Sequence, residues 1–148
     1  MNKFRIVYAT KTRHSKKLAE AIGKALNIKA DNVSDNPALE DVDLLFIVGG
    51  IYGGGSLPEL LDFVKNLDGG KIKSAALVTS CVSKKQGQDS IRKLLDEKNI
   101  KVMDEILCQG SFLFIKFGHP NSADIQEAVD FAIRLSKKVS ESGGENDE

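Results

Sequence analysis

Short apolar runs alternate along the chain with stretches in which apolar residues recur at helical spacing. Three runs, residues 4–9, 44–48 and 75–79, are almost continuously apolar and rich in β-branched residues. Such runs are typical of strands that are covered on both faces. Apolar and polar residues alternate only partly over residues 28–33, as they do in an edge strand. The longer segment 101–110 is mixed in composition and is interpreted as the last strand. The pattern therefore predicts five strands.

Amphipathic helices are predicted between these strands and after the last one. The first has Ser15 as its N-cap and apolar residues at helical spacing over residues 18–26. The second begins at Pro58, a residue that is favoured in the first turn of a helix. Two further helices are predicted around residues 91–95 and over residues 121–139.

This alternation predicts an α/β fold with a doubly wound, five-stranded parallel sheet in the order 2-1-3-4-5, covered by helices on both faces as a three-layer sandwich. Residues 1–139 are expected to form a single domain, and the polar segment 140–148 a disordered tail. Ligands of such sheets bind beyond the carboxyl ends of the strands, at the switch point. That rule selects the connections 10–15, 49–57 and 80–87.

The connection after the first strand has the composition of an anion site. It leads directly into a helix and consists of Thr10, Lys11, Thr12, Arg13, His14 and Ser15. The free N–H groups and the dipole of a helix N-terminus favour an anion, and hydroxyl and cationic side chains add hydrogen bonds to phosphate oxygens. The alternative is a solvated loop whose cations point into water; the position at the end of the first strand favours a phosphate.

The connection after the third strand offers one aromatic side chain among glycines. Its candidate ligand-binding residues are Gly50, Ile51, Tyr52, Gly53 and Gly54. Consecutive glycines allow the backbone to approach a planar ligand, and Tyr52 is the best available stacking group because the chain has no tryptophan. The sequence fits neither GxGxxG here nor GxxxxGK[ST] in the first connection, which argues against a dinucleotide fingerprint and a P-loop.

The connection after the fourth strand contributes small residues that can approach the edge of a ring. Its candidates are Ser80, Cys81, Val82 and Gly87. Cys81 has no His or acidic residue near it in sequence, so packing is favoured over a nucleophilic role. His119 precedes the last helix and is assigned to a turn and cap, and no catalytic residue or metal ligand is predicted.

Charge and cysteine content narrow the class of protein further. The 148 residues include 21 basic and 21 acidic ones, a balance that does not favour nucleic-acid or membrane-surface binding. The two cysteines are far apart and form no CxxC pair, which argues against a disulfide scaffold or zinc site and fits the cytoplasm. No signal segment and no apolar stretch of about 20 residues appears, so membrane insertion is not expected. We expect a monomer or weak dimer.

A phosphate loop after the first strand and an aromatic, glycine-rich loop after the third require a flat ligand with a terminal phosphate, and FMN meets that description. On these features the sequence resembles the flavodoxin family, over residues 4–138. The first-loop signature of the family is matched at Ile6, Val7, Tyr8, Thr10, Ala19 and Ile22. Arg13 replaces a small residue, usually Gly, and Ser15 replaces a Thr. The segments CQGSF and GHPNSADIQEAVDFA also resemble many short flavodoxin-like proteins.

The resemblance implies a flavodoxin-like fold and an FMN-bound carrier that shuttles electrons between redox partner proteins. Residues 10–15 would surround the FMN phosphate, Tyr52 would stack on the ring, the peptide of Gly53 would flip to hydrogen-bond the flavin N5, and residues 80–87 would line the other side. The second stacking aromatic of the family and its usual acidic excess are absent.

Other functions are compatible with the same fold. One is an FMN-dependent reductase of a quinone or small substrate, and another is a module that has lost FMN because Arg13 fills the phosphate site. A phosphorelay receiver is excluded, since the first and third strands end in Ala9-Thr10 and Gly49-Gly50 rather than in acidic residues. If FMN binds, Lys84 and Lys85 near the ring edge predict a higher hydroquinone potential than in a typical flavodoxin, because cations stabilise the anionic reduced ring.

Overall fold

The computed structural model describes residues 3–9, 13–52, 55–81, 87–109 and 122–146. Its parallel sheet has the order β2-β1-β3-β5-β6. The strands are β1 (Phe4–Tyr8), β2 (Ala30–Asn32), β3 (Leu44–Tyr52), β5 (Ser74–Cys81) and β6 (Lys101–Gln109). A two-residue strand, β4 (Gly55–Ser56), pairs antiparallel with β3. Apart from β4, this is the predicted 2-1-3-4-5 order, which is confirmed.

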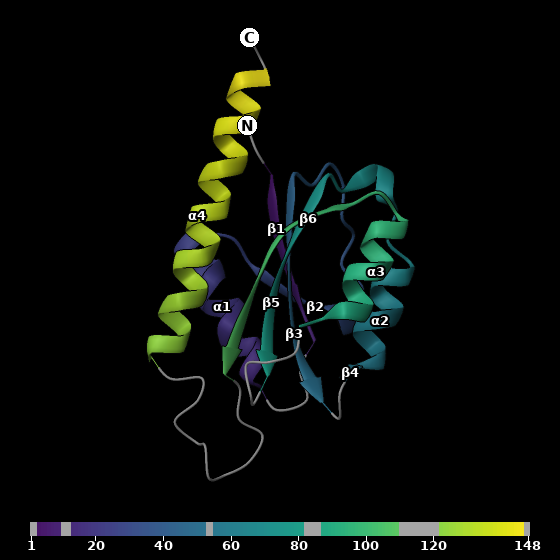
Figure 1. Ribbon diagram of the computed structural model, residues 1–148, viewed down its shortest axis with the longest axis vertical. Helices are drawn as coiled ribbons and strands as arrows, with labels where there is room; N and C mark the ends of the chain where they lie inside the picture. The colour runs from purple at the N-terminus through teal and green to yellow at the C-terminus, as the bar shows by residue number, and fades with distance from the viewer. Residues whose placement is uncertain (1–2, 10–12, 53–54, 82–86, 110–121, 147–148) are drawn as a thin grey trace.

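Helices cover both faces of the sheet, as the three-layer prediction requires. They are α1 (His14–Leu26), α2 (Pro58–Lys65), α3 (Asp89–Glu97) and α4 (Ser122–Asn146), with short 3-10 turns η1 (Val33–Asp35) and η2 (Gly69–Lys71). Helices α1 and α4 lie on one side of the strands, and α2 and α3 on the other (Figure 1).

Two hydrophobic clusters, one on each face, hold the layers together. Along β3, Leu44, Phe46 and Val48 belong to the cluster under α1 and α4, whereas Leu45 and Ile47 belong to the cluster under α2 and α3. All five side chains are 0% exposed. Because successive strand residues face opposite sides, a strand buried on both faces must be apolar throughout. This is why the continuous apolar runs identified the central strands.

Two element boundaries differ from the sequence-based expectation. Strand β3 continues to Tyr52, because Ile51 and Tyr52 pair with β4 instead of entering a loop. Helix α4 continues to Asn146, into the segment expected to be a disordered tail, and Figure 1 shows its last turns projecting beyond the sheet. The domain boundary at residue 139 stays a prediction.

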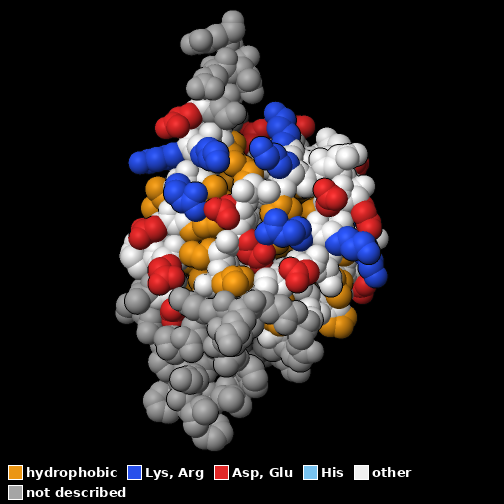
Figure 2. Space-filling model, in the orientation of Figure 1, with side chains coloured by type: hydrophobic (Ala, Val, Ile, Leu, Met, Phe, Trp, Pro, Cys, Tyr) orange, Lys and Arg blue, Asp and Glu red, His pale blue; other side chains and the backbone are white. Residues whose placement is uncertain are grey.

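The described surface has no strong charge asymmetry in the view of Figure 2, where Lys and Arg are interspersed with Asp and Glu. This agrees with the net charge of zero. Within the described ranges, no helix combines the length and the apolar character that a membrane crossing requires.

Candidate functional site

The predicted ligand residues lie at the carboxyl edge of the sheet. Gly50 of β3 and Ser80 of β5 are direct neighbours in the parallel register, and both are buried. The end of β1 is tied to the same edge by a hydrogen bond from the Ala9 amide to the Val48 carbonyl, 3.2 Å. The structure therefore brings the ends of the three selected strands together. Six of the predicted site residues lie outside the described residues: Thr10, Lys11, Thr12, Gly53, Gly54 and Val82.

The N-terminus of α1 carries basic side chains where helices normally carry acidic ones. Its first turn contains His14, Lys16 and Lys17 and no acidic residue. The other three α-helices each have an Asp or Glu in the first turn. Because the helix dipole places positive charge at the N-terminus, the charges of Lys16 and Lys17 are unfavourable there unless an anion is nearby. The composition of this turn therefore favours a bound anion.

The N-cap of α1 is Arg13, not Ser15 as the sequence predicted. Arg13 adopts a left-handed backbone conformation with φ of 74°, and its side chain makes no capping hydrogen bond. This conformation favours glycine. Glycine is also the usual residue at this position of the first-loop signature that the sequence resembles. The chain thus keeps the backbone conformation that glycine favours while it carries a guanidinium group.

Ser15 lies inside the first turn of α1 and is 0% exposed. Its neighbour His14 has a lowered pKa, because burial disfavours the imidazolium and Lys17 repels it. A neutral His14 donates hydrogen bonds but adds no charge near neutral pH.

Three buried polar side-chain atoms lack a hydrogen-bond partner within the part of the chain that the structure describes. They are Ser15 Oγ, Ser56 Oγ and Gln88 Oε1. Ser15 follows β1, Ser56 follows β3, and Gln88 follows β5. Unsatisfied buried polar groups are uncommon in folded proteins and call for an explanation. For Ser15 and Ser56, the placement after strand ends, where such folds bind ligands, supplies one. Gln88 Oε1 points instead into the interior beside Gly49.

The remaining predicted residues have different surroundings. The side chain of Ile51 is 8% exposed, which leaves little of its surface for a ligand. Tyr52 and Cys81 end β3 and β5, respectively. Gly87 lies beside the carboxylate of Glu105, since a β-carbon at this position would be 2.6 Å from both oxygens. Their predicted ligand contacts stay predictions, and Lys84, Lys85 and His119 lie outside the described residues.

Sequence reasoning missed a polar cluster below the third connection. Glu105 of β6 accepts hydrogen bonds from Thr79 Oγ1 (2.5 Å) and from the backbone N–H of Gln88 (2.8 Å). It also forms an ion pair with Arg92 of α3 (2.9 Å). The available signal was the acidic pair Asp104-Glu105 inside a strand. A carboxylate on a half-buried strand requires partners from neighbouring elements.

Comparison with known proteins gives a consistent family. Residues 5–114 match the model of the flavodoxin domain. Among curated proteins, none matches the chain in sequence.

Several solved structures share the fold. A short-chain flavodoxin associated with a bacterial microcompartment is 20% identical, with a TM-score of 0.69 over 94% of this chain and 99% of the other. Oxidised flavodoxin 2 from Bacillus cereus is 17% identical, with a TM-score of 0.65 over 92% and 99%. Rubredoxin oxygen:oxidoreductase from Desulfovibrio gigas is 13% identical, with a TM-score of 0.72 over 95% of this chain but 36% of that larger one.

Proposed function

Since the chain belongs to the flavodoxin family, we propose that it binds FMN and carries electrons between redox partner proteins. FMN supplies the redox chemistry, and the protein supplies binding, orientation and electrostatics. Cytoplasmic location and a monomeric or weakly dimeric state are further proposals that depend on the sequence alone.

The observation that carries this proposal is the buried Ser15 Oγ, which has no hydrogen-bond partner among the described residues. Ser15 Oγ belongs to the helix turn that has basic residues and no acidic one. A phosphate at that turn would accept a hydrogen bond from Ser15 and from the first free amides of α1, and it would offset the cations there. The residues present at α1 therefore fit the phosphate end of FMN.

The assignments at the ring end come from the sequence. Gly50 and Ser80 occupy neighbouring positions where β3 and β5 end, which supports a ligand surface made by both connections. Tyr52 would stack on the ring, and residues 80–87 would line its other side. The bound ring would then lie beyond the strand ends, where the fold places ligands.

Visible absorption and flavin titration test the proposal. Protein purified after growth with excess riboflavin should be yellow, and the cofactor-free form should bind FMN at least about tenfold more tightly than riboflavin, because only FMN carries the phosphate. A colourless preparation that ignores added FMN would overturn the proposal and favour the module that has lost its cofactor.

A second assay separates the carrier from the reductase. The FMN-loaded protein should show no sustained NAD(P)H- or quinone-dependent turnover by itself and should exchange electrons when a redox partner protein is added. Sustained turnover without a partner would assign the chain to the reductases on this fold.

A further inference from the structure

We infer that Glu105 is a positioning residue for the flavin ring: it ties the end of β5 to the start of α3 and so fixes both ends of the connection 80–87. We call Glu105, Thr79, Gln88 and Arg92 the Glu105 clamp. The inference depends on the proposed function, because the connection 80–87 is the one expected to line the ring.

A single carboxylate oxygen of Glu105 joins the two ends of the connection. One carboxylate oxygen, Oε2, accepts hydrogen bonds from Thr79 Oγ1 and from the Gln88 amide. Gln88 Nε2 also donates to Thr79 Oγ1 at 3.0 Å, so the three residues form a closed triangle. Thr79 and Gln88 are both 0% exposed. The residue before the connection and the residue after it are thus held by the same carboxylate.

The clamp also acts as a cap for α3. Gln88 is the N-cap of this helix, and its side chain makes no capping hydrogen bond. The carboxylate of Glu105 on β6 accepts a hydrogen bond from the backbone N–H of Gln88. Its negative charge thus lies at the positive N-terminal end of the helix dipole. The start of α3 therefore depends on a residue that is distant in sequence and belongs to another element.

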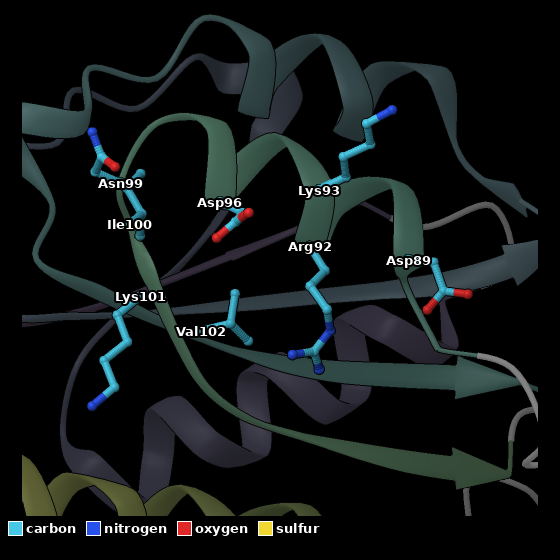
Figure 3. Close-up of a pocket in the computed structure, with 8 residues that line it drawn as sticks. All are labelled: Asp89, Arg92, Lys93, Asp96, Asn99, Ile100, Lys101 and Val102. Atoms are coloured by element: carbon cyan, nitrogen blue, oxygen red, sulfur yellow. The ribbon is translucent and has the colours of Figure 1, made fainter.

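Arg92 holds the second carboxylate oxygen. Its guanidinium donates to Glu105 Oε1 at 2.9 Å, and the side chain reaches from α3 toward the strands beside a groove of about 690 Å³ (Figure 3). The Glu105 side chain is 11% exposed and that of Arg92 is 44% exposed. Partial burial makes hydrogen bonds to this carboxylate stronger than those of a surface pair.

The neighbouring glycine fits the same arrangement. A β-carbon on Gly87 would lie 2.6 Å from both oxygens of Glu105, so a larger residue here would displace the carboxylate from its present position. Glu105 therefore holds Thr79, two residues before β5 ends at Cys81, lies beside Gly87, and holds Gln88 at the start of α3.

The adjacent residue on β6 provides a matched control. Asp104 pairs with Arg134 of α4 at 3.1 Å, so it also forms an arginine–carboxylate pair from the same strand, to the helix on the opposite face. Neither Asp104 nor Arg134 belongs to the clamp. Asp104 Oδ1 also accepts a hydrogen bond from the Glu105 backbone N–H at 2.8 Å. Asp104→Asn keeps a side-chain oxygen that can accept this bond, so the variant tests the loss of an ion pair without removing a residue of the clamp.

The first measurement uses cofactor-free protein. In Glu105→Gln, hydrogen exchange at the backbone amide of Gln88 should be about tenfold or more faster than in the wild type. The substitution removes the negative charge of the acceptor and its ion pair with Arg92, so the hydrogen bond weakens. Asp104→Asn should leave that rate unchanged. Equal rates in the wild type and Glu105→Gln would overturn the inference.

The second measurement compares FMN with riboflavin. Glu105→Gln and Thr79→Val should each lower the affinity for FMN and for riboflavin by the same factor, about tenfold, because the clamp acts at the ring end, which both flavins share. Thr79→Ser, which keeps the hydroxyl group, should restore wild-type affinity, and Asp104→Asn should bind as the wild type does.

The outcomes separate this inference from the proposed function. A wild-type protein that binds neither flavin overturns the proposed function. A wild-type protein that binds FMN, together with unchanged binding by Glu105→Gln, overturns the clamp alone. A loss confined to FMN, or an equal loss in Asp104→Asn, would also overturn it, because the effect would then lie at the phosphate or in general stability.

Discussion

Gly49 of β3 and Gln88 at the start of α3 occupy complementary space. A β-carbon on Gly49 would lie 2.9 Å from Gln88 Oε1 and 2.6 Å from Cδ2 of Leu60. Gln88 in turn donates from Nε2 to Thr79 and, at 3.5 Å, to the carbonyls of Ile47 and Val78. Because Gly49 has no side chain, the buried side-chain amide of Gln88 has room to reach the backbone of both β3 and β5.

Gly49→Ala should therefore lower the free energy of unfolding by about 1–3 kcal/mol, the usual cost of overpacking a filled interior. Urea unfolding followed by circular dichroism measures the change. Gly55→Ala is the matched control, because no atom of the described residues lies within 4 Å of the β-carbon that it would add. Equal losses in the two variants would show that the space beside Gln88 is not filled as described.

Ser15→Ala should weaken FMN binding without lowering the stability of the cofactor-free protein. The buried Oγ of Ser15 has no hydrogen-bond partner within the described ranges, so its removal should leave the stability of the cofactor-free protein unchanged or raise it. Binding of FMN should weaken about tenfold, whereas riboflavin binding should not change, because only FMN would use the hydroxyl group. Calorimetric titration with each flavin measures both constants. Equal losses for the two flavins would place Ser15 away from the phosphate.

The fold could be predicted from the sequence because central strands of a parallel sheet are apolar on both faces. The continuous run 44–48 identified β3, but its extension to Tyr52 was missed, since pairing with β4 is a tertiary contact that leaves no periodic signal in a glycine-rich segment. Likewise, Glu105 looked like one charge in a mixed strand. Its partners come from β5 and from the start of α3, which only the folded topology brings together with β6.

The N-cap of α1 was also predicted wrongly, for an identifiable reason. Propensity favours Ser at this position, yet the chain uses Arg13 in the left-handed region. The other described non-glycine residues with positive φ are all Asn or Asp, which tolerate this region better: Asn27, Asn36, Asp41 and Asn99. Local propensity therefore lost to a backbone conformation that the connection requires.

Arg13→Gly should raise the free energy of unfolding of the cofactor-free protein by about 1 kcal/mol relative to Arg13→Ala. Both variants remove the guanidinium group, so their difference isolates the strain of a β-carbon at φ of 74°. Thermal and urea unfolding should agree on the sign. If Arg13→Ala proves the more stable variant, the left-handed conformation of this residue is not strained.

His14 should make the stability of the cofactor-free protein depend on pH. Its pKa is lowered from 6.5, first by burial and then by Lys17. Below pH 6.5 the unfolded chain therefore binds more protons at this residue than the folded protein does, so stability falls as the pH falls from about 6.5 toward the folded pKa. Between about pH 8 and pH 5, the wild type should lose more stability than His14→Gln. Parallel losses in the two proteins would contradict this.

FMN should reverse that dependence at the same residue. A phosphate beside the first turn of α1 would stabilise the imidazolium and raise the pKa of His14, so binding would take up a proton and tighten as the pH falls. His14→Gln should flatten the trend, while protonation of the phosphate itself affects both proteins equally. Calorimetry in buffers of different ionisation enthalpy counts the protons directly. Equal proton uptake by the wild type and His14→Gln would mean that the phosphate is not bound beside His14.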